Sequence, residues 1–257
     1  ILKEAWQKTL CSRFSINLGL LFIGLLAALV FHGASLYYGG FEVIQSDVKI
    51  ATMVNLIVTL LILPFIASVE MMGVFHAVGM RTEPKLMFAF LKRASWVVLC
   101  SLFTSVLISL GFQLYIFPGI FLAVTLSLTI PLVIEKKMTP MKAIVLSVQT
   151  LRFKFLSLFV LYFILFMSLI ALFVPLVLLL ESNFAPLGVI MFLLGISFLA
   201  PLFYNVKGII YREIFGVSLA ENNLPADSTY IASSTAEQKA EKLNSDSNSD
   251  SDDTFSA

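Results

Sequence analysis

Six long apolar stretches, separated by short polar segments, dominate this sequence and restrict the folds that it can adopt. Most Lys and Arg residues lie in alternate segments: the N-terminal segment, the second and fourth loops, and the end of the last stretch. The first, third and fifth loops contain only one basic residue, Lys49. The positive-inside rule therefore predicts six spans with both termini in the cytoplasm. The predicted spans cover about residues 16–36, 51–76, 94–116, 120–134, 155–180 and 186–210.

The composition is that of an integral membrane protein. Hydrophobic residues make up 59% of the 257 residues and charged residues 13%, and the mean hydropathy is +0.95, which is too apolar for a soluble domain. The predicted fold class is all-α, because five of the six stretches have close to the ~20 residues that a transmembrane helix needs. The first stretch lacks a signal-peptide cleavage site, so we expect it to be retained. The net charge of +1 gives no indication of nucleic-acid binding.

Three basic segments outside the spans predict short helices that lie in the membrane interface. Residues 1–14 place apolar side chains four apart, with a frayed N-terminus as the alternative. Residues 81–93 and the segment from Thr139 each begin with Thr and a Pro in the first turn, which is typical of a helix start. We expect basic residues here to contact anionic lipid headgroups. The candidate headgroup contacts are Lys85, Lys92, Arg93, Lys136, Lys137 and Lys142.

Two spans have features that predict how they pack. The fourth, residues 120–134, reaches only ~22 Å as a helix. It must therefore be buried by its neighbours, thin the bilayer, or be extended by snorkelling lysines. The third span carries Ser101, Ser105 and Ser109 at four-residue spacing. We interpret this ridge of small residues as a helix-packing surface rather than a pore lining.

The C-terminal part of the chain has a different composition. From about residue 217 it is rich in Ser, Asp, Asn and Glu and poor in apolar residues. Such a segment cannot bury enough apolar surface to fold. We expect residues 217–257 to form a disordered acidic tail in the cytoplasm, beside a membrane domain of residues 1–216.

The sequence contains no motif for catalysis, metal binding or a cofactor. No nucleophile–base pair or Gly-rich phosphate loop is present. The two histidines, His32 and His76, are predicted at opposite ends of their spans, too far apart to share a metal ion. We therefore expect a protein that is not an enzyme, with no metal and no cofactor.

Glu70 is the one carboxylate well inside a predicted span, where an ionised group is costly. Residue counting puts Glu70 and Lys207 at similar depth near the basic side, so they could pair if the second and sixth spans are neighbours. Asn17 and Asn205 lie at a similar depth. These four residues predict either a polar vestibule open to the cytoplasm or a set of helix-pairing contacts.

A resemblance to a known family lies in residues 117–159. The residues that carry it are the turn Phe117-Pro118-Gly119-Ile120-Phe121-Leu122-Ala123, then Pro131, Glu135-Lys136-Lys137-Met138, Ala143, Ser147 and Leu151. This pattern resembles the uncharacterised YciC-type family of bacterial inner-membrane proteins, and it is similar to membrane domains attached to some glycerophosphodiester phosphodiesterases. The resemblance implies a multi-pass inner-membrane protein of Gram-negative bacteria and implies no reaction.

Two functions are compatible with these features. The first is a non-enzymatic role in membrane or envelope organisation, with membrane lipids or other membrane proteins as partners. The basic interfacial segments and the small-residue ridge favour it. The alternative is a permease or export component for a small or amphipathic solute, which a continuous cavity along Glu70, Asn205 and Lys207 would favour.

Overall fold

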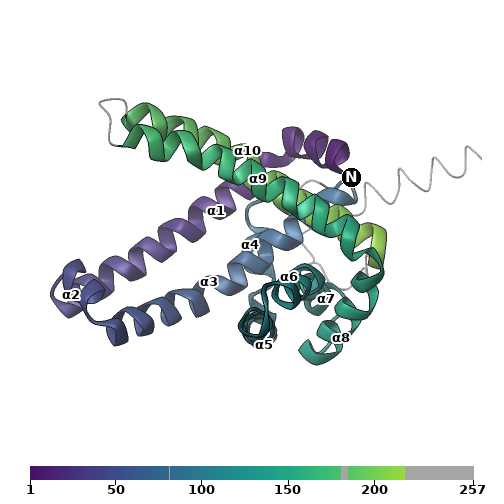
Figure 1. The fold of residues 1–257 in the computed structure, drawn as a ribbon, viewed down its shortest axis with the longest axis horizontal. Helices are drawn as coiled ribbons and strands as arrows, with labels where there is room; N and C mark the ends of the chain where they lie inside the picture. Colours follow the sequence, from purple (N-terminus) through teal and green to yellow (C-terminus); the bar gives the residue numbers. More distant parts are fainter. Residues whose placement is uncertain (81, 181–184, 218–257) are drawn as a thin grey trace, which may run out of the picture. The chain divides into compact units, whose positions relative to one another are not determined.

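The computed structural model describes residues 1–80, 82–180 and 185–217, apart from the side chains of Cys11, Ser12 and Lys92. The predicted acidic tail lies outside the described residues from Ser218 onward. Every regular element in the described part is helical, and six segments are long and apolar enough to span a membrane. The chain is therefore an all-α multi-pass membrane protein, as the sequence predicts (Figure 1). The helices are α1 (Leu2–Tyr38), α2 (Phe41–Ser46), α3 (Val48–Ala77), α4 (Leu86–Ala89), α5 (Ala94–Leu114), α6 (Ile116–Thr125), α7 (Thr129–Glu135), α8 (Pro140–Leu151), α9 (Phe155–Leu180) and α10 (Ala185–Phe215).

The N-terminal segments differ from the prediction. Residues 1–14 do not form a separate helix, because α1 continues unbroken for 37 residues with no Gly or Pro between the interfacial segment and the span. Of the predicted segment 81–93, Arg81 lies outside the described residues, and residues 82–93 form only the short α4 and a 3₁₀ turn, Leu91–Arg93. The third predicted interfacial helix is present as α8, with Pro140 in its first turn.

The fourth span is longer than predicted and is interrupted. Helices α6 and α7 and the turn between them cover 20 residues, Ile116–Glu135, and about half of this segment is buried within the protein. At the break the backbone N–H groups of Ser127 and Thr129 donate to the carbonyls of Val124 and Leu126, and the hydroxyl groups of the same two residues donate to the same carbonyls. The segment is thus long enough to span, and its neighbours bury about half of it.

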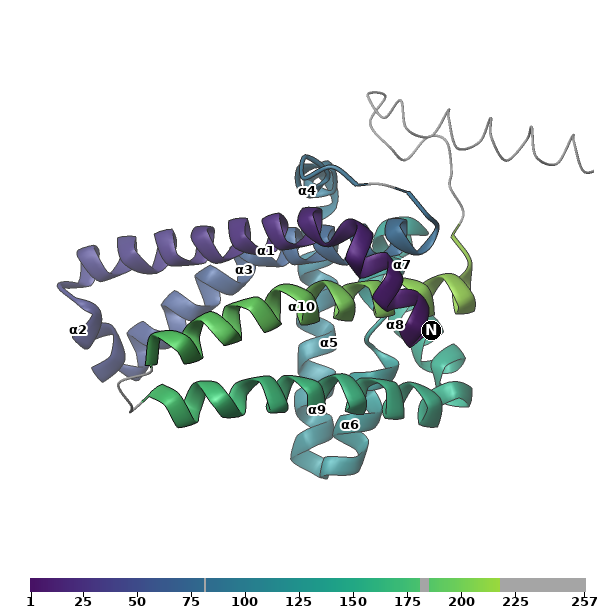
Figure 2. The ribbon, with the colours of Figure 1, turned by 90° about the horizontal axis from the view of Figure 1, so that it is seen from above.

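Helices α3 and α10 lie at the centre of the packing: α3 contacts α1, α2, α4, α5, α7 and α10. Helix α10 has fewer neighbours. It contacts α3, α9 and α1, and it lies beside α9 in both views (Figure 1 and Figure 2). Burial on α3 and α10 is concentrated in their C-terminal parts, from Pro64 and from Pro201 onward. Most large apolar residues in their N-terminal parts are exposed, as expected for helix surfaces that face lipid.

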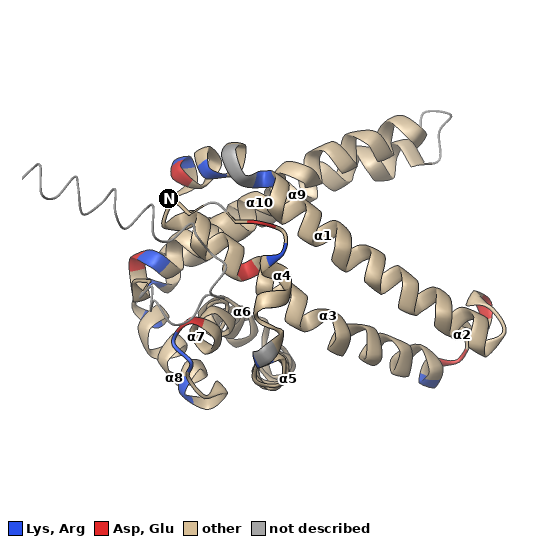
Figure 3. Ribbon diagram, turned by 180° about the vertical axis from the view of Figure 1, so that it is seen from behind, with Lys and Arg blue, Asp and Glu red and all other residues tan. Residues whose placement is uncertain are grey.

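Charged residues gather at one end of the described domain. Figure 3 shows most Lys and Arg residues near the N-terminus, α4, α7 and α8, whereas the region around α2 holds Glu42, Asp47 and Lys49. We call these the basic end and the α2 end. The buried parts of α3 and α10 lie towards the basic end.

Candidate functional site

A buried ion pair joins α3 to α10. The ammonium nitrogen of Lys207 lies 2.6 Å from Oε1 of Glu70, and the side chains are 9% and 8% exposed. The ammonium also lies 5.7 Å from the centre of the Phe203 ring, a cation–π distance. The second carboxylate oxygen of Glu70, Oε2, is buried and has no hydrogen-bond partner among the described residues. The pair holds opposite charges together where either one alone would be costly.

Two glycines let α3 and α10 approach closely enough for this pair to form. A Cβ atom at Gly73 would collide with the carbonyl oxygen of Tyr204, and one at Gly208 would collide with the carbonyl group of Gly73. The two backbones are therefore in direct contact, as in other helix pairs that cross at small residues. Glu70 lies one turn before Gly73, and Lys207 directly precedes Gly208.

A second set of hydrogen bonds lies beside the ion pair and joins the same two helices to their neighbours. Nδ1 of His76 lies 3.1 Å from Oδ1 of Asn205, and its Nε2 lies 2.7 Å from the Thr82 hydroxyl. The Asn205 amide donates to the Thr9 hydroxyl at 2.9 Å, which donates to the carbonyl of Ala5. With the amide assigned this way, Nδ1 carries the histidine proton and Nε2 accepts from Thr82. One network thus connects α1, α3, α10 and the loop before α4.

A second ion pair joins α1 to α10. Arg212 donates to both carboxylate oxygens of Glu4, at 2.7 and 3.1 Å, and to the carbonyl oxygen of Ala77 at 2.6 Å. This bidentate geometry is the strong form of an Arg–carboxylate contact. The hydrogen bond from Arg212 lowers the pKa of Glu4 below its ordinary value of 4.5.

The stability of this contact should depend on pH. Because the pKa of Glu4 is lowered in the folded protein, the contact contributes fully above pH 4.5 and is lost as the pH falls through the lowered value. Both side chains are about a third exposed, so we expect solvent screening to limit the effect to about 0.2–1 kcal/mol. The measurement is the thermal unfolding midpoint from pH 3 to pH 7, for the wild type and Glu4→Gln. The variant should show a flatter curve, and two parallel curves would contradict the assignment.

The candidate headgroup contacts fall into two groups. Lys85, Lys137 and Lys142 are exposed, whereas two other cations bind carbonyl groups of neighbouring elements. Arg93 donates to the carbonyl of Val133, and Lys136 donates to that of Phe215. The side chain of Lys92 lies outside the described residues. Three of the candidate lysines are therefore exposed, whereas two cations hold the protein's own helices together.

The structure brings three of the four predicted core polar residues together and places the fourth elsewhere. Glu70, Lys207 and Asn205 all lie at the contact between α3 and α10. Asn17 instead donates to the carbonyl and hydroxyl groups of Ser197, at 2.9 and 2.8 Å. Ser197 precedes Lys207 by ten residues, or about 15 Å along α10. Asn17 therefore makes a separate contact between α1 and α10.

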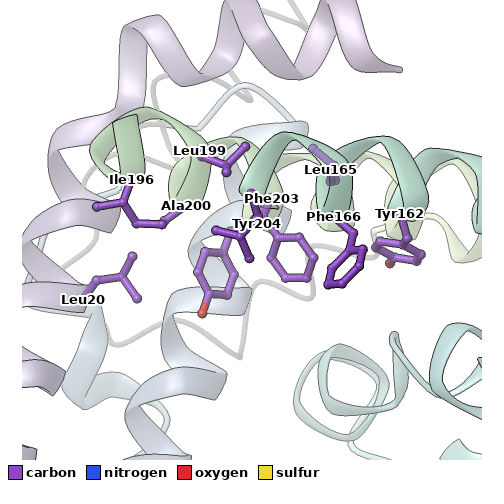
Figure 4. A pocket seen from close by; sticks show the side chains of 10 residues that line it. Leu20, Tyr162, Leu165, Phe166, Ile196, Leu199, Ala200, Phe203 and Tyr204 are labelled. Carbon is purple, nitrogen blue, oxygen red and sulfur yellow. The ribbon is translucent and has the colours of Figure 1, made fainter. Parts of the chain in front are cut away.

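An apolar groove of about 460 Å³ lies along α9 and α10. It is close to the Glu70–Lys207 pair, because Phe203 both lines the groove and contacts Lys207. Figure 4 shows side chains of both helices projecting into it, with Leu20 of α1 at one side. Two tyrosines line it: Tyr162, whose hydroxyl donates to Ser127, and Tyr204, whose hydroxyl has no hydrogen-bond partner in the described part of the chain. Neither Glu70 nor Lys207 lines it. The groove is thus suited to a hydrocarbon ligand rather than to an ion.

We call the Glu70–Lys207 pair, the hydrogen bonds around His76 and Asn205, and the Glu4–Arg212 pair the polar layer. Several of its residues could not be predicted from the sequence. Thr9 and Thr82 are small hydroxyl residues of common type, and only the fold shows that they flank His76 and Asn205. The close helix contact at Gly73 and Gly208 could have been predicted, since each glycine lies in a span within three residues of Glu70 or Lys207. No group of three His, Cys, Asp or Glu residues that could hold a metal occurs among the residues that the structure describes.

Comparisons with known proteins give no match: no family model, no curated protein and no solved structure is similar to this chain.

Proposed function

We propose that this chain is a multi-pass protein of the bacterial inner membrane, with both termini in the cytoplasm, that is not an enzyme. It supports membrane or envelope organisation through contacts of its basic end with anionic lipids or with other membrane proteins. The distribution of basic residues supports the orientation. The resemblance of residues 117–159 to the YciC-type family supports the bacterial location.

The observation that carries the proposal is the set of exposed lysines beside α8. This helix buries Ala143, Ile144 and Ser147, and the Ser147 hydroxyl donates to the carbonyl of Thr125. Its other face exposes Met141 and Val145 next to Lys142. An apolar face flanked by lysines suits a helix that lies at the level of the headgroups.

The packing of the polar layer favours this role over a permease. Glu70 and Lys207 are bonded to each other, and Asn205 is bonded to His76 and Thr9. The helices that carry them are in backbone contact at Gly73. These polar groups act as helix contacts, which is the second of the two roles that the sequence predicts for them.

The test is retention of lipid by the purified full chain, measured by native mass spectrometry with phosphatidylglycerol and phosphatidylethanolamine. We expect the wild type to prefer phosphatidylglycerol. In the variant K85A/K137A/K142A, the preference should fall by about tenfold or more, because each lysine contributes about 1 kcal/mol. Lys49→Ala, at the α2 end, is the control and should retain the preference.

Two results would count against the proposal. Equal binding of both lipids by the wild type would remove the headgroup role. Uptake of an amphipathic solute into proteoliposomes that is lost in Glu70→Gln would favour the permease instead.

A further inference from the structure

The groove along α9 and α10 lies at the depth of the hydrocarbon core. Its residues on α10 run from Ile196 to Tyr204, about 16 to 29 Å from the start of that helix at Ala185. Water is absent at this depth, and an empty apolar groove would forgo the dispersion contacts of its lining. Something apolar from the surroundings must fill it.

The two ends of the groove differ in chemistry. Helix α9 leads away from the basic end and α10 leads towards it, so Tyr162 and Tyr204 lie at the end of the groove nearest the basic end. Leu169 and Ile196 lie at the other end. In Figure 4 the Tyr204 ring projects from α10 with its hydroxyl directed away from that helix. The groove is therefore amphipathic along its length, with a hydroxyl donor nearest the charged end.

The same face of α10 continues to a cation. Ile196, Leu199 and Phe203 recur at helical spacing, and Lys207 follows one turn later with its ammonium 5.7 Å from the Phe203 ring. A ligand with an apolar body and a polar end would thus have its polar end towards Tyr204. This matches the orientation of a phospholipid whose headgroup lies at the basic end.

We propose that the groove holds one acyl chain of a phospholipid from the surrounding bilayer, with the Tyr204 hydroxyl donating to its ester carbonyl. The size agrees: a water-sized group, close to a methylene, takes about 30 Å³, so 460 Å³ accommodates about 15 of them. This deepens the proposed function and rests on it for the lipid partner. It assigns the hydrocarbon chain to the groove and leaves the headgroup to the basic end.

Binding from the bilayer gains no hydrophobic energy, because the acyl chain leaves one apolar environment for another. The chain should therefore exchange, and its position is better detected by covalent trapping. The probe is phosphatidylglycerol with a diazirine in the middle of one acyl chain, incorporated into nanodiscs with the full-length protein and activated by light. Labelled positions are mapped by peptide mass spectrometry.

In the wild type we expect label concentrated on the groove residues of α9 and α10, and little on the exposed face of α5. Ala200→Trp should fill the groove and lower this label by about tenfold. Ala171→Trp is the matched control, since Ala171 is exposed on α9 and does not line the groove. Leu169→Trp, at the other end of the groove, provides a second filling variant if Ala200→Trp does not fold.

Label spread evenly over lipid-facing helices in the wild type would overturn the inference without any variant. So would a groove that stays unlabelled, because a second copy or another protein would then occupy it. The two proposals fail separately: loss of the phosphatidylglycerol preference in the native mass spectra removes the headgroup role, whereas uniform labelling removes only the groove.

Discussion

Replacing Glu70 by Ala should destabilise the protein by about 3–5 kcal/mol, because Lys207 would remain buried without its partner. The side chain of Lys207 is only 9% exposed. Without the carboxylate, its ammonium would keep only a weak cation–π contact with the Phe203 ring. The measurement is the free energy of unfolding in mixed micelles, with the thermal midpoint in nanodiscs as a second readout.

The double variant Glu70→Leu with Lys207→Leu shows whether the destabilisation comes from an unpaired charge or from lost packing. Removing both charged groups and filling the space with apolar side chains should restore most of the stability, since a buried pair is often matched by hydrophobic residues. The coupling between the two sites follows from the double-mutant cycle. If the single and double variants lose the same free energy, the ion pair is not what the Glu70 substitution disrupts. Lys49→Ala, exposed at the α2 end, should leave stability unchanged.

Substituting Ala for Gly208 should cost about 3 kcal/mol or more, at the upper end of what overpacking costs. The added Cβ would collide with the carbonyl group of Gly73, and a backbone group cannot rotate away as a side chain can. The helices must then separate, which also stretches the contact between Lys207 and Glu70. Gly73→Ala should have a similar effect, because its Cβ would meet the carbonyl oxygen of Tyr204.

A matched control exists on α1. A Cβ at Gly24 would meet nothing within 4 Å. Gly24→Ala should therefore be neutral or stabilise by up to about 1 kcal/mol through helix propensity. Unfolding midpoints for the three variants, measured under one set of conditions, decide the matter: equal stability of Gly208→Ala and Gly24→Ala would mean that the helix crossing tolerates an extra methyl group.

Much of the architecture could be predicted from hydropathy alone. The six spans follow from the length of the apolar stretches, and the structure has six helical segments of this kind. Hydropathy could not show that residues 1–14 continue into the first span, because an interfacial helix and the extension of a spanning helix have the same amphipathic pattern. Nor could it place α2, whose six residues carry no periodic signal.

The candidate site was predictable in depth for three of its four residues. Counting residues along the second and sixth spans, which run in the same direction, puts Glu70, Lys207 and Asn205 at comparable levels. Asn17, counted to a similar level, instead contacts Ser197, about 15 Å before Lys207 along α10. The rotation of each helix about its axis cannot be counted at all, because successive residues point 100° apart. Rotation is fixed by packing at positions such as Gly73, which depth counting does not include.

The polar layer also determines when this protein becomes stable during its synthesis. Glu70, His76 and Glu4 all take partners from α10, which follow them by 137, 129 and 208 positions. At about 5–20 residues per second, Lys207 is made roughly 7–30 s after Glu70. A nascent chain that stops before α10 leaves a carboxylate unneutralised within the bilayer. Completion of the last helix supplies Lys207, which neutralises that carboxylate.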